Sequence, residues 1–141
     1  MTKAKRLEDW YRRVYLEGDL DAVETLFTDR TRAEGLIKDM QVGPEDIRVF
    51  VMALMYMVEA PNFRIVHAVE TEDWLAALIE TTAVRIDTGD PIRVTGQLMA
   101  RFQGDCIAEA YNSFDFLSFF QQMGLLPEHA LEIGMSGQKL A

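Results

Sequence analysis

The chain changes its hydrophobic pattern near residue 62, and this change limits the folds that it can adopt. Before that point apolar residues recur at helical spacing. After it, β-branched and aromatic residues alternate with polar ones and are interrupted by turn signals at Glu72-Asp73, at residues 87–90 and at Gly104-Asp105. Helices followed by strands, rather than alternating with them, predict an α+β fold with antiparallel strands.

The first half predicts three helices. Leu7, Trp10 and Val14 form one apolar stripe within residues 5–17, and Gly18 ends that helix. A short second helix, capped by Asp19, extends through residue 27 and is followed by a charged loop. The third helix begins at Pro44, where a first helical turn tolerates proline, and Pro61 ends the run.

The second half predicts about four main strands and a closing helix. We expect the strands at residues 63–71, 74–86, 91–103 and 106–114, and the helix in the segment DFLSFFQQMG, closed by Gly124 and Pro127. From about residue 128 we expect a short helical turn and a loose tail. The 141 residues fit a single domain, residues 1–141.

Charge and cysteine content exclude several functional classes. The net charge of −9 repels nucleic acid and anionic lipid, so neither is expected as a partner. The lone Cys106 forms no intrachain disulfide and fits a cytoplasmic setting, and the most hydrophobic run, Val49 to Val58, is about half a membrane span. His67 and His129 are scattered, without metal-ligand spacing, so we expect neither a metal nor a redox cofactor.

The register of the last hairpin places the candidate site. If Gly104-Asp105 form a two-residue turn, one face of the sheet is apolar and carries two carboxylates, Glu109 and Asp115. The cross-strand pairs on this face would be Phe102 with Ile107, Ala100 with Glu109 and Leu98 with Tyr111, with Val94 level with Asp115. The other face carries Arg101, Met99 and Gln97 against small residues. That mixed face would suit the interface of a homodimer formed through the sheet.

Several short motifs, in their order and spacing, carry a family resemblance. They are YLEGDLDAVETLF near the start, VGPEDIRVFV at the third helix, then VTG, QGD and EAYNSFD before QQMGLLP. The chain resembles the nuclear transport factor 2-like (NTF2-like) superfamily and, within it, the SnoaL-like polyketide cyclase group. The resemblance implies a cone-shaped α+β barrel whose helices close a cavity against a concave sheet, commonly as a dimer.

The resemblance also implies a catalytic group. In cyclases of that family a carboxylate at the end of the last core strand acts as general acid/base, and Asp115 stands at the matching position of EAYNSFD. Members with that activity tend to carry a histidine in a GTHxG-like stretch, and the corresponding TTAVRIDTGDPIRVTG contains none. The other reading of Asp115 is a helix cap for the segment beginning at Phe116.

The remaining site candidates share the predicted apolar face or a helix that would cover it. Tyr111 could donate to a bound carbonyl, and Glu109 would lie at one end of the cavity, paired with an arginine. Trp10, Leu98 and Phe102 would line the cavity and contact the substrate. His67 opposes Leu78, away from Asp115, if Glu72-Asp73 form a two-residue turn, which makes it a structural residue.

Two functions from different classes follow. The first is binding of a small, largely apolar molecule, with Asp115 as the acid/base of a cyclase, isomerase or dehydratase step that needs no cofactor. The second is a non-catalytic ligand-binding or dimeric interaction module, in which side chains can fill the cavity. A weaker third is an epoxide hydrolase, which needs Asp, Arg and Asn at one water, whereas Arg101 lies on the opposite face of the predicted sheet.

Overall fold

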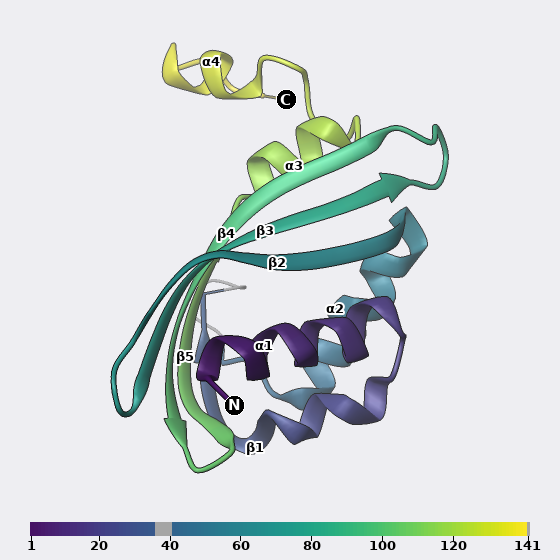
Figure 1. Cartoon of the computed structure of the whole chain (residues 1–141). Coiled ribbons are helices and arrows are strands. Elements are labelled where there is room, and N and C mark those ends of the chain that lie inside the picture. The colour runs from purple at the N-terminus through teal and green to yellow at the C-terminus, as the bar shows by residue number, and fades with distance from the viewer. Residues whose placement is uncertain (36–40, 141) are drawn as a thin grey trace.

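The computed structural model describes residues 1–35 and 41–140 and has an α+β architecture, as predicted. A curled sheet with strand order β1-β5-β4-β3-β2 wraps around helices on its concave side (Figure 1). Along the chain the elements are α1 (Lys3–Tyr11), η1 (Arg12–Leu16), η2 (Leu20–Thr25), β1 (Phe27–Glu34), α2 (Pro44–Met57), β2 (Val58–Glu70), β3 (Trp74–Arg85), β4 (Pro91–Gln103), β5 (Cys106–Phe114), α3 (Phe116–Gln122) and α4 (Ala130–Met135).

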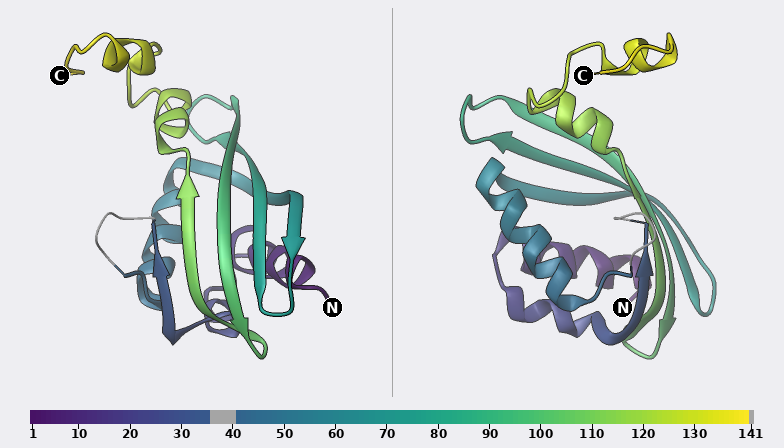
Figure 2. Two further views of the ribbon diagram at one scale, coloured as in Figure 1. Left: turned by 90° about the vertical axis from the view of Figure 1, so that its left-hand side faces the viewer. Right: turned by 180° about the vertical axis from the view of Figure 1, so that it is seen from behind.

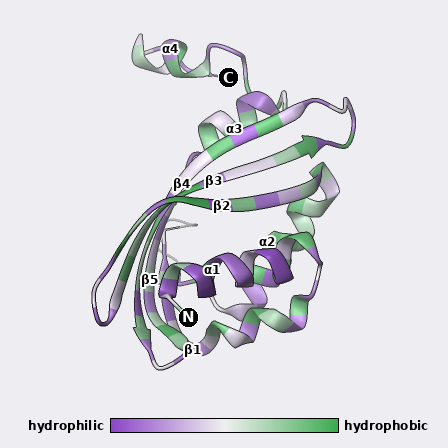
Figure 3. Ribbon diagram, viewed as in Figure 1, coloured by the Kyte–Doolittle hydropathy of each residue, from purple (hydrophilic) through white to green (hydrophobic). Residues whose placement is uncertain are grey.

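The first predicted helix is present as α1 continued by the π-helical turn η1. The Thr2 hydroxyl caps α1 by accepting the Lys5 amide at 3.1 Å. The predicted stripe is buried, with Leu7 and Val14 fully covered. The helical face thus enters the core beneath the sheet, while the opposite face of α1 stays hydrophilic (Figure 3).

The strand β1 is a correction to the predicted charged loop. The second helix is the 3-10 helix η2 and ends at Thr25, after which β1 runs parallel to β5. The Thr31 hydroxyl donates to the Ile107 carbonyl at 2.6 Å and secures this pairing. Only Phe27, Thr31 and Ala33 of β1 are buried, so the segment TDRTRAE carries too little apolar alternation to signal a strand.

The sheet is curled and open, in line with the predicted curved sheet packed under N-terminal helices, and its described part has five strands where about four main strands were predicted. In the described part of the chain β1 and β2 form its two edges. Helix α2 ends at Met57, and β2 begins directly at Val58, so Pro61 lies inside an edge strand rather than ending the helix. The buried residues of β4 recur at every second position, because successive side chains of a strand point to opposite faces of the sheet.

Helix α3 closes one end of the curled sheet and is tied to β4. The Gln122 side chain accepts the Arg93 amide at 2.9 Å and donates to the Arg93 carbonyl at 2.8 Å. A guanidinium nitrogen of Arg85 donates to the Gln122 carbonyl at 3.1 Å. Beyond this helix the chain continues to α4, which stands away from the sheet (Figure 2).

No helix among the described residues is long and apolar enough to span a membrane.

Glycine is required at Gly35, where β1 meets β5. Its φ is +104°, and a Cβ atom there would lie 2.0 Å from the Asn112 carbonyl oxygen. We expect Gly35→Ala to lower the free energy of unfolding by about 3 kcal/mol or more, because strain and a backbone clash add. Gly104→Ala is the control, since Gly104 has φ +64° with open space around it and should cost only about 1–2 kcal/mol. Urea denaturation measures both, and equal losses would contradict the clash.

Candidate functional site

A cavity of about 250 Å³ lies between the concave face of the sheet and the helices that cover it. Its floor is formed by inward-facing residues of β3 and β4, including Ile79, Thr81 and Val94. The wall opposite is the buried stripe of α2, with Ile47 and Leu54. Apolar side chains therefore form most of the cavity surface.

Aromatic rings gather at one end of the cavity, where α1 and η1 meet β2. The rings of Tyr11 and Phe63 are stacked, with centroids 4.4 Å apart and planes 7° apart. The Tyr15 ring lies 4.5 Å from Phe63. Such offset and edge-on pairs are favourable, so this group forms a fixed aromatic wall.

A second aromatic group forms the other end, where α3 approaches α2. Phe116 of α3 lies edge-on to Phe114 at 4.8 Å between centroids and to Phe50 at 6.2 Å. Phe119 and Phe120 complete this group and also line the cavity. The contact of Phe50 with Phe116 is where α2 and α3 meet over the cavity.

The polar residues of the described lining, besides Trp10, are all uncharged: Tyr11, Tyr15, Thr81, Gln97, Asn112 and Ser113. Gln97 and Ser113 pair with each other, and their side chains alternate to the convex face, so the polar side chains directed at the cavity are the other four. Within the described residues none of their side-chain groups has a hydrogen-bond partner, and no fully buried side-chain polar atom is left unpaired. These groups are therefore open to the cavity. Burial raises the pKa of Tyr11 and of Tyr15, and the nearby Tyr11 adds to the rise at Tyr15, so both phenols stay protonated near neutral pH.

The described lining of the cavity contains no acidic, basic or histidine side chain. A general acid/base that titrates near neutral pH is therefore missing from this lining. The cavity can bind and orient a molecule by apolar contact and by hydrogen bonds from neutral groups.

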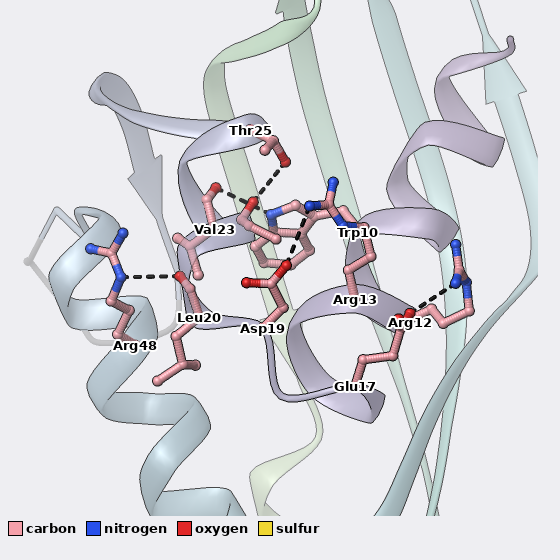
Figure 4. A network of polar contacts seen from close by, with 10 residues as sticks. Trp10, Arg12, Arg13, Glu17, Asp19, Leu20, Val23, Thr25 and Arg48 are labelled. Carbon is pink, nitrogen blue, oxygen red and sulfur yellow. Dashed lines mark hydrogen bonds and ion pairs between the residues drawn. The ribbon is translucent and has the colours of Figure 1, made fainter.

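Trp10 is the predicted contact residue that lines this cavity. It is 5% exposed, and its indole N–H donates to the Val23 carbonyl at 3.2 Å (Figure 4). Around it, ion pairs and backbone contacts join η1, η2 and α2: Arg13 with Asp19 at 3.3 Å, and the Arg48 guanidinium donating to the Leu20 carbonyl at 3.1 Å. This network fixes the helical wall on which Trp10 stands.

Leu98 and Phe102 are on the concave face, as predicted, but they are packed into the core and do not line the cavity. Leu98 pairs with Asn112, and Phe102 pairs with Ile107. Asn112, which the sequence analysis did not select, takes the place at the cavity that was expected for its neighbour Tyr111.

The predicted inward orientation of Tyr111, Glu109 and Asp115 is wrong, and a β-bulge is the reason. The pair Phe102 with Ile107 is as predicted, but Arg101 then pairs with Glu109, so Ala108 is an additional residue in β5. Every later side chain of β5 changes face. The signal was present in the sequence: the apolar residues Ala110 and Phe114 are out of phase with Ile107.

Glu109 lies on the convex face at the centre of an ion cluster. It accepts hydrogen bonds from Arg101 at 2.8 Å, from Tyr111 at 2.9 Å and from Arg32 at 3.2 Å. These donors, Arg101 first, hold the pKa of Glu109 below its usual value. The predicted partnership of Glu109 with an arginine is present, but it belongs to the outer surface rather than to the cavity.

Asp115 is exposed and caps α3. Its carboxylate accepts the Ser118 amide at 3.0 Å, and the residue does not line the cavity. Of the two roles predicted for Asp115, the structure therefore contains the helix cap. His67 opposes Leu78 on the convex face, which is the register predicted for a structural residue.

Solved structures with the same architecture share low sequence identity with this chain. TsrD from Streptomyces laurentii has a TM-score of 0.72 at 17% identity, covering 89% of this chain and 99% of that one. A protein with a ketosteroid isomerase-like fold from Catenulispora acidiphila DSM 44928, in complex with trimethylamine, has a TM-score of 0.70 at 18% identity, covering 88% and 95%. A SnoaL-like polyketide cyclase from Agrobacterium tumefaciens strain C58 has a TM-score of 0.66 at 14% identity, covering 88% and 100%.

The architecture is thus that of the NTF2-like, ketosteroid isomerase-like fold, as the sequence motifs implied. The family model for the SnoaL-like domain matches residues 7–110, and the chain belongs to this family. A search of curated proteins found no match.

The capping role of Asp115 gives a prediction that separates stability from binding. Asp115→Ala should lower the free energy of unfolding by about 1 kcal/mol, because the Ser118 amide loses its acceptor, and Asp115→Ser should retain most of it. Chemical denaturation measures the loss. Binding of any cavity ligand should be unchanged in both variants, and a loss of binding without a loss of stability would contradict the assignment.

Proposed function

We propose that this protein binds a small, largely apolar molecule in the cavity between its sheet and its helices. The observation that carries the proposal is an unfilled cavity of about 250 Å³ with apolar walls and a few neutral hydrogen-bonding groups open to it. Pockets for small organic molecules combine such walls with a few polar groups that fix orientation. Membership of the SnoaL-like family supports a cavity with this purpose.

Binding without acid-base catalysis is the form of this function that we favour. Tyr11 and Tyr15 keep their protons because their pKa values are raised, so they act as hydrogen-bond donors and not as bases near neutral pH. Asp115 is engaged with the Ser118 amide outside the cavity. For the epoxide hydrolase alternative, Arg101 is bound to Glu109 on the convex face and Asn112 faces the cavity, so the required groups do not converge.

The binding proposal is tested with uncharged apolar compounds and a cavity-narrowing substitution. Ala53 of α2 lines the cavity and is also exposed, so it stands at its border. We expect at least one compound among naphthalene, decalin, octanol and progesterone to bind, measured by calorimetry. Ala53→Phe should weaken that binding at least about tenfold, because the ring occupies ligand space.

Met52→Phe is the matched control for this substitution. Met52 is 50% exposed, lies one residue away on the same helix and does not line the cavity. The Met52→Phe variant should have nearly the same affinity for the compound and the same free energy of unfolding as the unaltered protein. If no uncharged compound binds the unaltered protein, here or in the further experiment described below, or if both variants bind the compound as the unaltered protein does, the proposed function is wrong.

We also propose that the protein forms a homodimer through the convex face of its sheet. On this face Val69 is 69%, Met99 50% and Tyr111 42% exposed. These three side chains border an open groove together with Leu78 and Ala76. The charged residues of this face are held in compensated clusters, Glu109 with Arg32 and Arg101, and Glu80 with Arg64 and Arg93. Two copies of a chain with net charge −9 repel least when they meet through such a face.

The dimer proposal predicts the effect of a buried charge at the centre of this face. Met99→Asp should convert the dimer to a monomer, because the carboxylate would be desolvated against the second copy. Val49→Asp is the control, since Val49 is 58% exposed on α2, away from the sheet. Sedimentation velocity measures the mass, and a monomeric unaltered protein or a dimeric Met99→Asp variant would refute the interface.

A further inference from the structure

We propose that the ligand is an uncharged compound with one or two aromatic rings, of roughly the size of indanone. This inference rests on the proposed binding function and adds the size, charge and ring character of the ligand. It follows from the cavity volume, from the placement of aromatic side chains at both ends, and from the absence of charge in the described lining.

The cavity volume limits the ligand to a small ring system. An apolar protein cavity of roughly 150 Å³ holds a benzene molecule. By that scale, about 250 Å³ holds about ten non-hydrogen atoms, which is one ring with a substituent or two fused rings. A rigid compound of four fused rings, such as a steroid, is about twice too large.

The wall formed by α3 prevents the cavity from widening around a larger ligand. Phe119 and Phe120 line the cavity from α3. The helix is held to β4 at its beginning by the Asp115 amide, which donates to the Thr95 carbonyl at 3.3 Å, and at its end by both Gln122 bonds to Arg93. A larger ligand would have to displace the helix against these bonds.

The two aromatic groups favour an aromatic ligand over a saturated one. The stacked pair of Tyr11 and Phe63 stands at one end, and the edge-on contacts of Phe116 with Phe50 and Phe114 stand at the other. An aromatic ring between them can stack on faces and meet edges, as these side chains already do with one another. A saturated ring of the same size fills the volume without these contacts.

The lining excludes a charged ligand and favours one hydrogen-bond acceptor. In the described lining no ionic side chain is available to pair with a carboxylate or an ammonium group, and an unpaired charge is costly to bury. The hydroxyls of Tyr11 and Tyr15 are open to the cavity and protonated. They can donate to a carbonyl oxygen.

The experiment uses four compounds that share one skeleton, and one that is larger. Calorimetry compares 1-indanone with octahydroinden-1-one, which is saturated, with 1-aminoindane as a cation, with indane-1-carboxylate as an anion, and with progesterone. We expect 1-indanone to bind at least about threefold more tightly than its saturated analogue and at least about tenfold more tightly than either charged analogue. Progesterone should not compete for the site.

The variant Ala53→Phe locates the binding in each case. Loss of 1-indanone binding in this variant, with retention in Met52→Phe, places the compound in the cavity. If progesterone or a charged analogue binds there as tightly as 1-indanone, or if the saturated ketone does, the inference is overturned while the binding function stands. If no uncharged compound of either experiment binds, the proposed function itself fails.

Discussion

The register shift at Ala108 is the constraint on which the chemistry of this molecule depends. A single additional residue in β5 decides which of two adjacent rows of side chains faces the helices. With the bulge, Ala110, Asn112 and Phe114 face inward, and the carboxylates of Glu109 and Asp115 are kept outside. Without the bulge, Glu109 and Asp115 would face an apolar wall, and burying unpaired carboxylates would lower the stability of the fold. The neutrality of the cavity and the charge of the convex face are two results of one backbone irregularity.

The general fold was predictable because its signals are carried by many residues. The stripe of Leu7, Trp10 and Val14, the proline at the start of α2 and the turn signals between strands each place an element within a few residues. β1 was not predictable in the same way, because its pairing with β5 depends on a long-range contact of Thr31 with the Ile107 carbonyl. Such a contact has no signature in a sequence window.

The site was predictable only in part, for a different physical reason. Trp10 was placed at the cavity correctly, since a helical stripe fixes its own face. The β5 candidates depended on counting residues from a turn, and one bulge inverts every later position. Tyr11 and Tyr15 belong to the same helical segment as Trp10, but their place at the cavity depends on β2, whose Phe63 packs against both rings, and a contact so distant in the sequence has no local signal.

The bonds between Gln122 and Arg93 have a consequence for the exposed edge of the sheet. β5 ends at Phe114, which pairs with Gly96, so the first part of β4, before Gly96, has no strand beside it on that side. The Gln122 amide offers Arg93 the acceptor and the donor that a strand would have offered. An unpaired strand edge is a template on which another chain can assemble. The Gln122 side chain thus occupies both backbone groups of Arg93, as a neighbouring strand would, and this leaves them unavailable for pairing with another chain.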